Sequence, residues 1–390
     1  MYVIEAKLYG RNKQYRIIEE MIRAAQFIRN KMLRYWMDGR GIGKKDLMQY
    51  NTQLRHKFEW CASLNSMACQ ASVERAWLAI SRFYANCKNP ALKKKGYPNF
   101  KKNTRSLEYK TSGWKLSEDR RRITFTDKFG AGTFRMRGGF DLNFYRVEQI
   151  KRVRIIRRAD GYYVQFCIKH ERTEPPQLTG KRIGLDVGLA HFYTDSNGEK
   201  IENPRHLRKS EKALRRAQRR VSRKKKGSKN RLKAIKRLGR KHLKVQRQRK
   251  DFAVKLARCV VTSNDVVVHE DLQVRNLVKN HSLAKSISDA GWRQFLDWLG
   301  YFGKVYGKTV IAVSPQYTSQ ECSQCGRIAK KSLSQRTHIC ECGCVLDRDE
   351  NAAINILRKG LSTVGQTGIH AWGHDNHCQL GESLSDKLCD

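Results

Sequence analysis

Three acidic residues beside apolar segments have the types and spacing for metal-assisted chemistry. Asp186 lies in IGLDVG, Glu270 ends the apolar run of VVVHEDL, and Asp349 lies in DRDENAAINI. Hydrolysis of a phosphodiester needs an activated water and a stabilised leaving oxygen. Two Mg²⁺ ions about 4 Å apart provide both when acidic side chains hold them, and Mg²⁺ prefers oxygen ligands. We therefore predict that the three acids meet at one divalent-metal site.

Each of these acids also has a simpler structural interpretation. Asp347 or Asp349 is a plausible helix cap, and Glu270 stands where a strand could reach the surface. Gly184 and Gly188 flank the first acid and permit close approach of backbone or substrate. The metal site is favoured because these are the only acids that border such apolar strands in a very basic chain.

Two cysteine pairs lie just before the last acid. Cys322-Ser-Gln-Cys325-Gly is a typical zinc knuckle, and Cys340-Glu-Cys342-Gly is a shorter one with a single intervening residue. We predict zinc on these four thiolates, with Cys344 as the alternate for the last position. A redox pair or a chance pairing is the competing interpretation, and a closed four-thiolate site would be structural rather than catalytic.

The charge balance indicates a polyanionic partner. The 390 residues include 80 Lys and Arg against 36 Asp and Glu, a formal net charge of +44. Self-repulsion of this size disfavours a compact monomer unless a polyanion neutralises it, and nucleic acid is the obvious candidate. An anionic membrane surface is the competitor, but the sequence has no apolar span long enough to cross a bilayer, no lipidation signal and no signal-peptide pattern.

The distribution of the 12 cysteines argues against a secreted disulfide protein. Five lie between 322 and 344, while most of the others are scattered singly in apolar or helical contexts. Scattered single cysteines are usually small buried hydrophobic residues. The cytoplasm is therefore the expected compartment, with nucleoid association expected from the charge.

The elements before residue 180 change period along the chain. Residues 2–9 alternate as one strand, 12–88 carry apolar stripes of amphipathic helices, and 106–170 alternate again as a β-rich segment, with a hairpin turning at Asp160 and Gly161. The first strand is expected to pair with that segment, which makes the helices an insertion. In the basic linker 90–103, Tyr97 and Phe100 are candidate base-stacking residues or parts of a plain turn.

The elements after residue 180 place the acids. KRIGLDVGLAHFYTDSNGEKI reads as strands turning at Asn197 and Gly198, and NDVVVHEDL and KTVIAVSP as buried strands with helices between and after them. Between residues 204 and 250 stand 23 Lys and Arg against one acid. Apolar residues there recur every seven positions, which favours a basic helical hairpin over a disordered tail. Its candidate nucleic-acid contacts are Arg215, Arg219, Lys224 and Lys225.

The order of these motifs resembles that of the TnpB family, the transposon-associated RNA-guided nucleases related to miniature type V CRISPR effectors. The resemblance covers about 180–360 and rests on GLDVG, HEDL, SISDAGW, SPQYTSQECSQCG, CECG and DRDENAAINI. It implies that Asp186, Glu270 and Asp349 bind the metal ions, since the family's last acid stands two residues before Asn351. Asp347 is the less favoured neighbour. The short second knuckle departs from the commoner spacing.

The resemblance also implies an α+β multidomain fold. The expected parts are a wedge-like β-barrel (1–10 and 104–178), an inserted helical recognition domain (11–103), an RNase H-like nuclease of the RuvC type (179–320 and 345–360, with the basic hairpin 204–250) and a zinc ribbon (321–344). Residues 361–390 carry Gly and Ser with little periodicity, and we expect them to form a disordered tail.

The implied function is RNA-guided, Mg²⁺-dependent cleavage of both strands of a DNA next to a short recognition motif. The partners would be a guide RNA from the end of the transposable element and the target duplex, and we expect a monomer. Two alternatives remain open: a transposase or junction resolvase of the same fold that acts without RNA, and a non-catalytic RNA-guided DNA-binding regulator.

Overall fold

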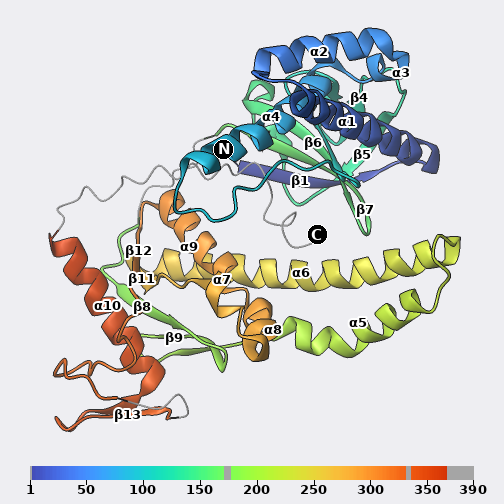
Figure 1. The fold of residues 1–390 in the computed structure, drawn as a ribbon. Coiled ribbons are helices and arrows are strands. Elements are labelled where there is room, and N and C mark those ends of the chain that lie inside the picture. The colour runs from blue at the N-terminus through green and yellow to red at the C-terminus, as the bar shows by residue number, and fades with distance from the viewer. Residues whose placement is uncertain (1, 171–176, 331–334, 367–390) are drawn as a thin grey trace. The chain divides into compact units, whose positions relative to one another are not determined.

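The computed structural model describes residues 2–170, 177–330 and 335–366, which form two compact units divided at residue 171 (Figure 1). The first unit is a β-sheet with helices, and the second is a smaller sheet with helices and a cysteine-rich loop. No helix within the described ranges is both long and apolar enough to cross a membrane.

The first unit is built on a seven-stranded antiparallel sheet in the order β2-β6-β7-β1-β5-β4-β3. Strand β1 pairs with both β5 and β7, which confirms that the helices after it are an insertion between paired strands. The elements are β1 (Tyr2–Tyr9), α1 (Asn12–Asp38), α2 (Lys44–Lys57), α3 (Glu59–Ala62), α4 (Ser66–Lys88), β2 (Ser106–Tyr109), β3 (Trp114–Leu116), β4 (Arg122–Phe125), β5 (Gly132–Arg137), the 3₁₀ turns η1 (Leu142–Phe144) and η2 (Val147–Gln149), β6 (Ile150–Arg158) and β7 (Gly161–Ile168).

Two details of this sheet differ from the sequence-based expectation. Among the described strands no ladder joins the edge strands β2 and β3, so the expected barrel is an open sheet here. Both edge strands are short, and helix α4 packs against β2. The β6–β7 hairpin turns through Ala159 and Asp160, one residue earlier than predicted, because Gly161 already pairs with Arg158.

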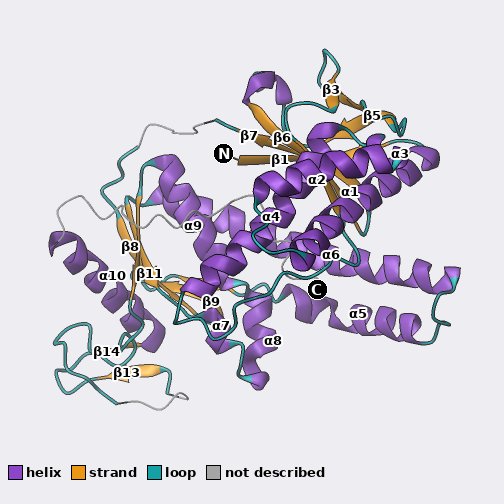
Figure 2. Cartoon of the chain, turned by 45° about the horizontal axis from the view of Figure 1, so that its top comes forward, coloured by secondary structure: helices purple, strands orange, loops and turns teal. Residues whose placement is uncertain are grey.

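The second unit contains a five-stranded sheet in the order β10-β9-β8-β11-β12 (Figure 2). Strands β8, β11 and β12 run parallel, and β9 and β10 add an antiparallel meander that turns at residues 196–198 as predicted. The strands are β8 (Arg182–Val187), β9 (His191–Asp195), β10 (Lys200–Glu202), β11 (Val266–Glu270) and β12 (Thr309–Val313), and a small ribbon follows, β13 (Thr337–Ile339) with β14 (Val345–Asp347).

Helices cover both faces of this sheet. One face packs on α6 (Lys229–Ser263), α8 (His281–Ala290) and α9 (Trp292–Tyr306), with Leu185, Phe192 and Phe295 fully buried between them. The other face packs on α10 (Arg348–Gln366) through Val268, Val313 and Ile356. The short α7 (Val274–Leu277) precedes α8. Helices on both faces explain why β8 and β11 read as almost continuous apolar runs.

The basic segment folds as the predicted helical hairpin. Helix α5 (His206–Ser222) packs on α6 through Leu214, Val221 and Val245, which are buried. The predicted apolar register therefore lies at the α5–α6 contact. Asp289 of α8 holds the base of the hairpin, because its carboxylate accepts the amide of Leu207 at 2.8 Å and the guanidinium of Arg249.

The first residues of the expected disordered tail are helical. Helix α10 continues to Gln366, so the prediction was wrong for 361–366. Gly360 lies so close to Val268 that a Cβ atom there would meet its side chain at 2.5 Å, and this packing keeps the last turns of α10 on the sheet. The rest of the predicted tail, 367–390, lies outside the described residues.

Candidate functional site

The first two acids lie on neighbouring parallel strands. Leu185 of β8 is partnered with His269 of β11, and Asp186 and Glu270 are the next residue on each strand. Because side chains alternate along a strand, both acids share the face of Gly184 and Val268, which α10 covers. The sheet therefore presents two carboxylates at the carboxyl ends of adjacent strands, where ligands of open parallel sheets commonly bind.

Helix α10, which packs on the same face of the sheet, carries the third acid in its first turn. The helix can approach β8 closely because Gly184 has no side chain: a Cβ there would lie 2.2 Å from the carbonyl oxygen of Ala353. Asp349 stands in the first turn of α10, with Arg336 Nη1 4.0 Å from its Oδ2 atom. Close packing of a helix on a glycine thus sets the position of this acid relative to the sheet.

Asp347 has a different role from Asp349. Its Oδ1 atom accepts the amide of Asp349 at 2.9 Å, and its Oδ2 atom accepts Lys200 Nζ at 2.6 Å. Burial opposes its ionisation, but Lys200 and the amides outweigh burial and lower the pKa of Asp347. Asp347 therefore caps the start of α10 and is paired with Lys200.

The carboxylates of Glu270 and Asp349 affect the ionisation of Asp186. Burial first, then the carboxylates of Glu270 and Asp349 and, to a smaller extent, that of Asp347, raise the pKa of Asp186 well above its ordinary value, while Arg348 lowers it. Burial also raises the pKa of Glu270. A cluster of carboxylates that disfavour one another's charge is stabilised by a bound cation. In the described part of the chain, the carboxylate oxygens of the three acids do not all lie within 4.8 Å of one another. The sulfurs of the four knuckle cysteines do meet this limit.

Buried polar side chains hold Glu270 and the segment that contacts it, residues 318–323. Thr318 donates its hydroxyl to Glu270 Oε1 at 2.6 Å. Asn355 Nδ2 donates to the carbonyl of Thr318 at 3.0 Å, and Asn351 binds the amide of Ser323 and the carbonyl of Glu321. Both asparagines are fully buried on α10. Their spacing of four residues on an otherwise apolar helix face is the signal that could have identified them.

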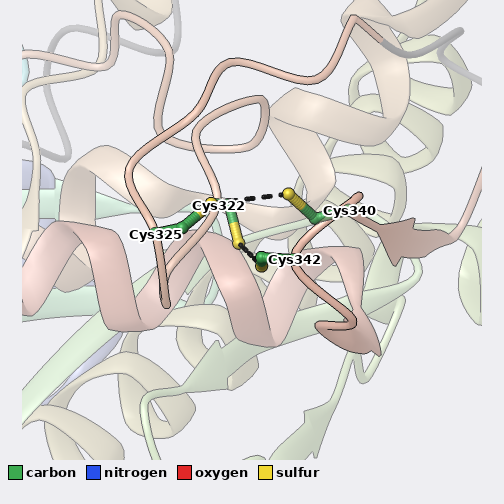
Figure 3. Close-up of side chains that lie close together, drawn as sticks. All are labelled: Cys322, Cys325, Cys340 and Cys342. Atoms are coloured by element: carbon green, nitrogen blue, oxygen red, sulfur yellow. Dashed lines mark hydrogen bonds between the residues drawn. The ribbon is translucent and has the colours of Figure 1, made fainter.

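The predicted zinc ligands come together in the loop before α10. The sulfurs of Cys322, Cys325, Cys340 and Cys342 lie within 4.8 Å of one another, with Cys322 to Cys342 at 3.6 Å and Cys325 to Cys340 at 3.5 Å (Figure 3). Four sulfurs about 2.3 Å from a central zinc would be about 3.8 Å apart, so the cluster fits a structural zinc ion.

The backbone of the first knuckle stabilises a thiolate. Burial opposes ionisation of Cys322, but the amides of Cys325 and Gln324 outweigh it and lower the pKa of this thiol to about 6. The alternate ligand Cys344 is buried and lies in a second group with Cys322 and His338. The four-cysteine cluster contains Cys342 and not Cys344. Cys342 is also the residue that the sequence favoured as the fourth zinc ligand.

The predicted nucleic-acid contacts are exposed, two in the first unit and four on the α5–α6 hairpin. The ring of Tyr97 packs against Trp36 and Phe83, so it has a structural role while remaining 53% exposed, and Phe100 is 43% exposed. On the hairpin, Arg215 pairs with Glu211 of the preceding turn. The remaining candidates, Arg219, Lys224 and Lys225, are exposed.

Comparison with known proteins identifies the family. Residues 165–281 match the OrfB_IS605 model, described as "Probable transposase", and residues 292–356 match the "Cas12f1-like, TNB domain" model. "Putative RNA-guided DNA endonuclease InsQ" of Escherichia coli K12 is 30% identical over 321 residues, which cover 77% of this chain and 76% of that protein. The chain belongs to the TnpB family.

Other TnpB relatives match a smaller part of the chain. A "Putative RNA-guided DNA endonuclease" of Streptomyces pristinaespiralis is 42% identical over 207 residues. The match covers 53% of this chain and about half, 51%, of the relative's length. Among solved structures, Cas12f1 in a complex with sgRNA and target DNA has a similar fold, with a TM-score of 0.56 at 16% identity over 89% of this chain and 83% of that one. The TnpB chain described here thus shares the Cas12f-like α+β fold, with a cysteine cluster near its C-terminal end.

Proposed function

We propose that this protein is an RNA-guided, Mg²⁺-dependent endonuclease that cuts double-stranded DNA. One observation carries the proposal: Asp186 and Glu270 stand side by side at the ends of adjacent parallel strands, and Asp349 enters from α10 on the same face. The fold would be RNase H-like of the RuvC type. A parallel core extended by an antiparallel meander, with acids at the strand ends, supports it.

The three acids fit hard divalent cations. All their donor atoms are oxygens, and burial together with repulsion from Glu270 and Asp349 raises the pKa of Asp186, which a bound cation would offset. Bound Mg²⁺ would supply an activated water and stabilise the leaving oxygen. Asp186, whose charge is opposed by both Glu270 and Asp349, would be the central metal ligand of the three. Thr318 keeps the carboxylate of Glu270 oriented, and Arg336 brings a positive charge to the same edge beside Asp349.

The remaining parts of the chain would bind the nucleic acids. We assign recognition of the guide RNA and of the motif beside the target to the wedge (1–10 and 104–178) and the helical domain (11–103). The nuclease would comprise 179–320 and 345–360, extended by the rest of α10, and the ribbon 321–344 would be a structural zinc module. The names of the relatives and their shared family support an RNA partner from a transposable element.

Substitution of the acids tests the site. In cleavage of a plasmid carrying the guided target, Asp186→Ala, Glu270→Ala and Asp349→Ala are each expected to lower the rate at least about a thousandfold, because each removes a metal ligand. Asp347→Ala is the matched control and should retain most activity in Mg²⁺, since this side chain caps a helix. Chelation should abolish cleavage by the parent protein. Parent-like cutting by Asp186→Ala would refute the assignment.

The competing functions predict different outcomes. A transposase or resolvase of the same fold would cut without RNA, so ribonuclease treatment would leave its cleavage unchanged. A non-catalytic regulator would bind the target without cutting it under any metal condition. The presence of all three acids favours an enzyme.

A further inference from the structure

The loop between β5 and β6 carries two of the most exposed aromatic side chains in the described chain. Phe140 is 66% exposed and Phe144 is 72% exposed. Among the exposed large apolar side chains in the described ranges, only Leu178 has a higher exposed fraction. Neither ring contributes to the core of the first unit. Packing in the core therefore does not explain why two phenylalanines stand in this loop.

The loop that presents these rings is well held. Leu142 is buried in the core, and Asp141 caps the 3₁₀ turn by accepting the amide of Asn143 at 2.9 Å. Arg120, in the left-handed backbone region at φ 49°, donates its guanidinium to the carbonyls of Leu142 and Tyr145. The backbone beneath the rings is thus fixed by contacts that do not involve them.

The surroundings of Phe144 are aromatic and basic. Phe144 makes edge contacts with Tyr145 and His170, at ring centroid distances of 5.0 and 5.9 Å. Arg146, two residues after Phe144, is part of an open hollow of about 490 Å³, whose other lining residues are Lys151, Lys169, Gln149 and a single acid, Glu148. Gln149 lies 3.5 Å from the ring of His170, which Phe144 contacts. Flat apolar faces beside a positive hollow are complementary to nucleobases joined by phosphates.

We propose that Phe140 and Phe144, with Arg146, Lys151 and Lys169, form a binding site for unpaired nucleotides of RNA. Exposed aromatic rings can stack on the flat faces of unpaired bases. In a duplex the adjacent base pairs cover these faces. The target DNA enters as a duplex, whereas a folded guide contains single-stranded segments. The choice of guide RNA over DNA rests on the proposed function; the stacking site itself rests on the rings and the charges.

Photocrosslinking to the full-length protein locates the site. Trypsin cleaves after Arg137 and Arg146, so one peptide, 138–146 (GGFDLNFYR), holds both phenylalanines. After ultraviolet irradiation with a single-stranded oligouridine, this peptide is expected to carry a nucleotide adduct, and a fully paired RNA of equal length should give much less. Adducts on other peptides with none on 138–146 would overturn the proposal, as would equal adducts with the duplex.

Affinity supplies the second readout. The double variant Phe140→Ala, Phe144→Ala should bind the single strand about tenfold or more weakly than the parent, with an unchanged salt dependence because no phosphate contact is lost. Val147→Ala, also exposed in this loop, is the control and should bind like the parent. Unchanged binding by the double variant would contradict the site. If no RNA co-purifies with the protein but oligouridine binding still depends on the rings, the guided function fails and this site stands.

Discussion

Asp186 is the acid whose ionisation the fold opposes most clearly. Burial and the carboxylates of Glu270 and Asp349 all raise its pKa, and Arg348 offsets them only in part. A group with a raised pKa in the folded state contributes stability below its unfolded pKa and loses that contribution as pH rises through its folded pKa. Without bound metal, the charge of Asp186 should therefore destabilise the protein at neutral and higher pH.

Thermal unfolding in chelator tests this electrostatic account. Asp186→Asn should be more stable than the parent at pH 8, by about 1 kcal/mol, because a neutral side chain removes the repulsion. The difference should shrink toward pH 5 as the parent's Asp186 takes up a proton. Asp119→Asn is the control, since the pKa of this exposed acid is lowered by its bond from Ser117 and its charge is not opposed. Equal stability of Asp186→Asn and parent at pH 8 would argue against the carboxylate cluster.

At the scale of elements, the close contact between β8 and α10 positions the site. The sequence predicted β8, β11, β12 and α10 because apolar runs and a helical stripe are local signals, and it predicted the α5–α6 hairpin from apolar residues seven apart. It indicated that Gly184 permits a close approach but did not identify α10 as the element that approaches. Nor could it find Thr318 as the partner of Glu270, because that pairing depends on tertiary structure across 48 residues.

The open sheet of the first unit is a second example of what local patterns leave undetermined. Alternation predicts strands and which faces they bury, but closure of a barrel depends on whether the two edge strands reach each other. In the described residues β2 and β3 are four and three residues long and carry no shared ladder.

Substitution of Gly184 tests the importance of the β8–α10 contact. In Gly184→Ala the new methyl group would meet backbone atoms of Ala353 and Leu357, so we expect a loss of about 1–3 kcal/mol in the free energy of unfolding. Cleavage should fall as well, because Asp349 moves with α10. Gly300→Ala is the matched control: it lies inside α9 with no atom within 4 Å of the new group, so it should gain about 0.5–1 kcal/mol. A fully stable and active Gly184→Ala would contradict this packing.

At the scale of the whole molecule, charge is distributed unevenly along the chain. The segment between residues 204 and 250 holds half of the net charge of +44, and the structure displays much of it on the exposed surfaces of α5 and α6. Their apolar residues are used at the contact between the two helices. We therefore expect the hairpin to bind phosphates without reading sequence.

The salt dependence of nucleic-acid binding measures how many phosphate contacts the hairpin makes. Arg219→Ala, Lys224→Ala and Lys225→Ala combined should weaken nucleic-acid binding and reduce the slope of log affinity against log salt by about 2, since each lost phosphate contact removes about 0.7–0.9. The charge-preserving exchange of the same three residues, Arg to Lys and Lys to Arg, should keep the slope. An unchanged slope in the alanine variant would place the phosphate contacts elsewhere.

The central claim is that this protein cuts DNA where a bound RNA directs it. The most direct measurement is sequencing of the RNA that co-purifies with the chain, followed by cleavage in Mg²⁺ of a DNA library in which one member contains a matching target. We predict cuts in the matching DNA alone, lost after ribonuclease treatment and restored by adding back the RNA. Cleavage that survives complete removal of RNA, or that ignores the match between RNA and DNA, would contradict the account.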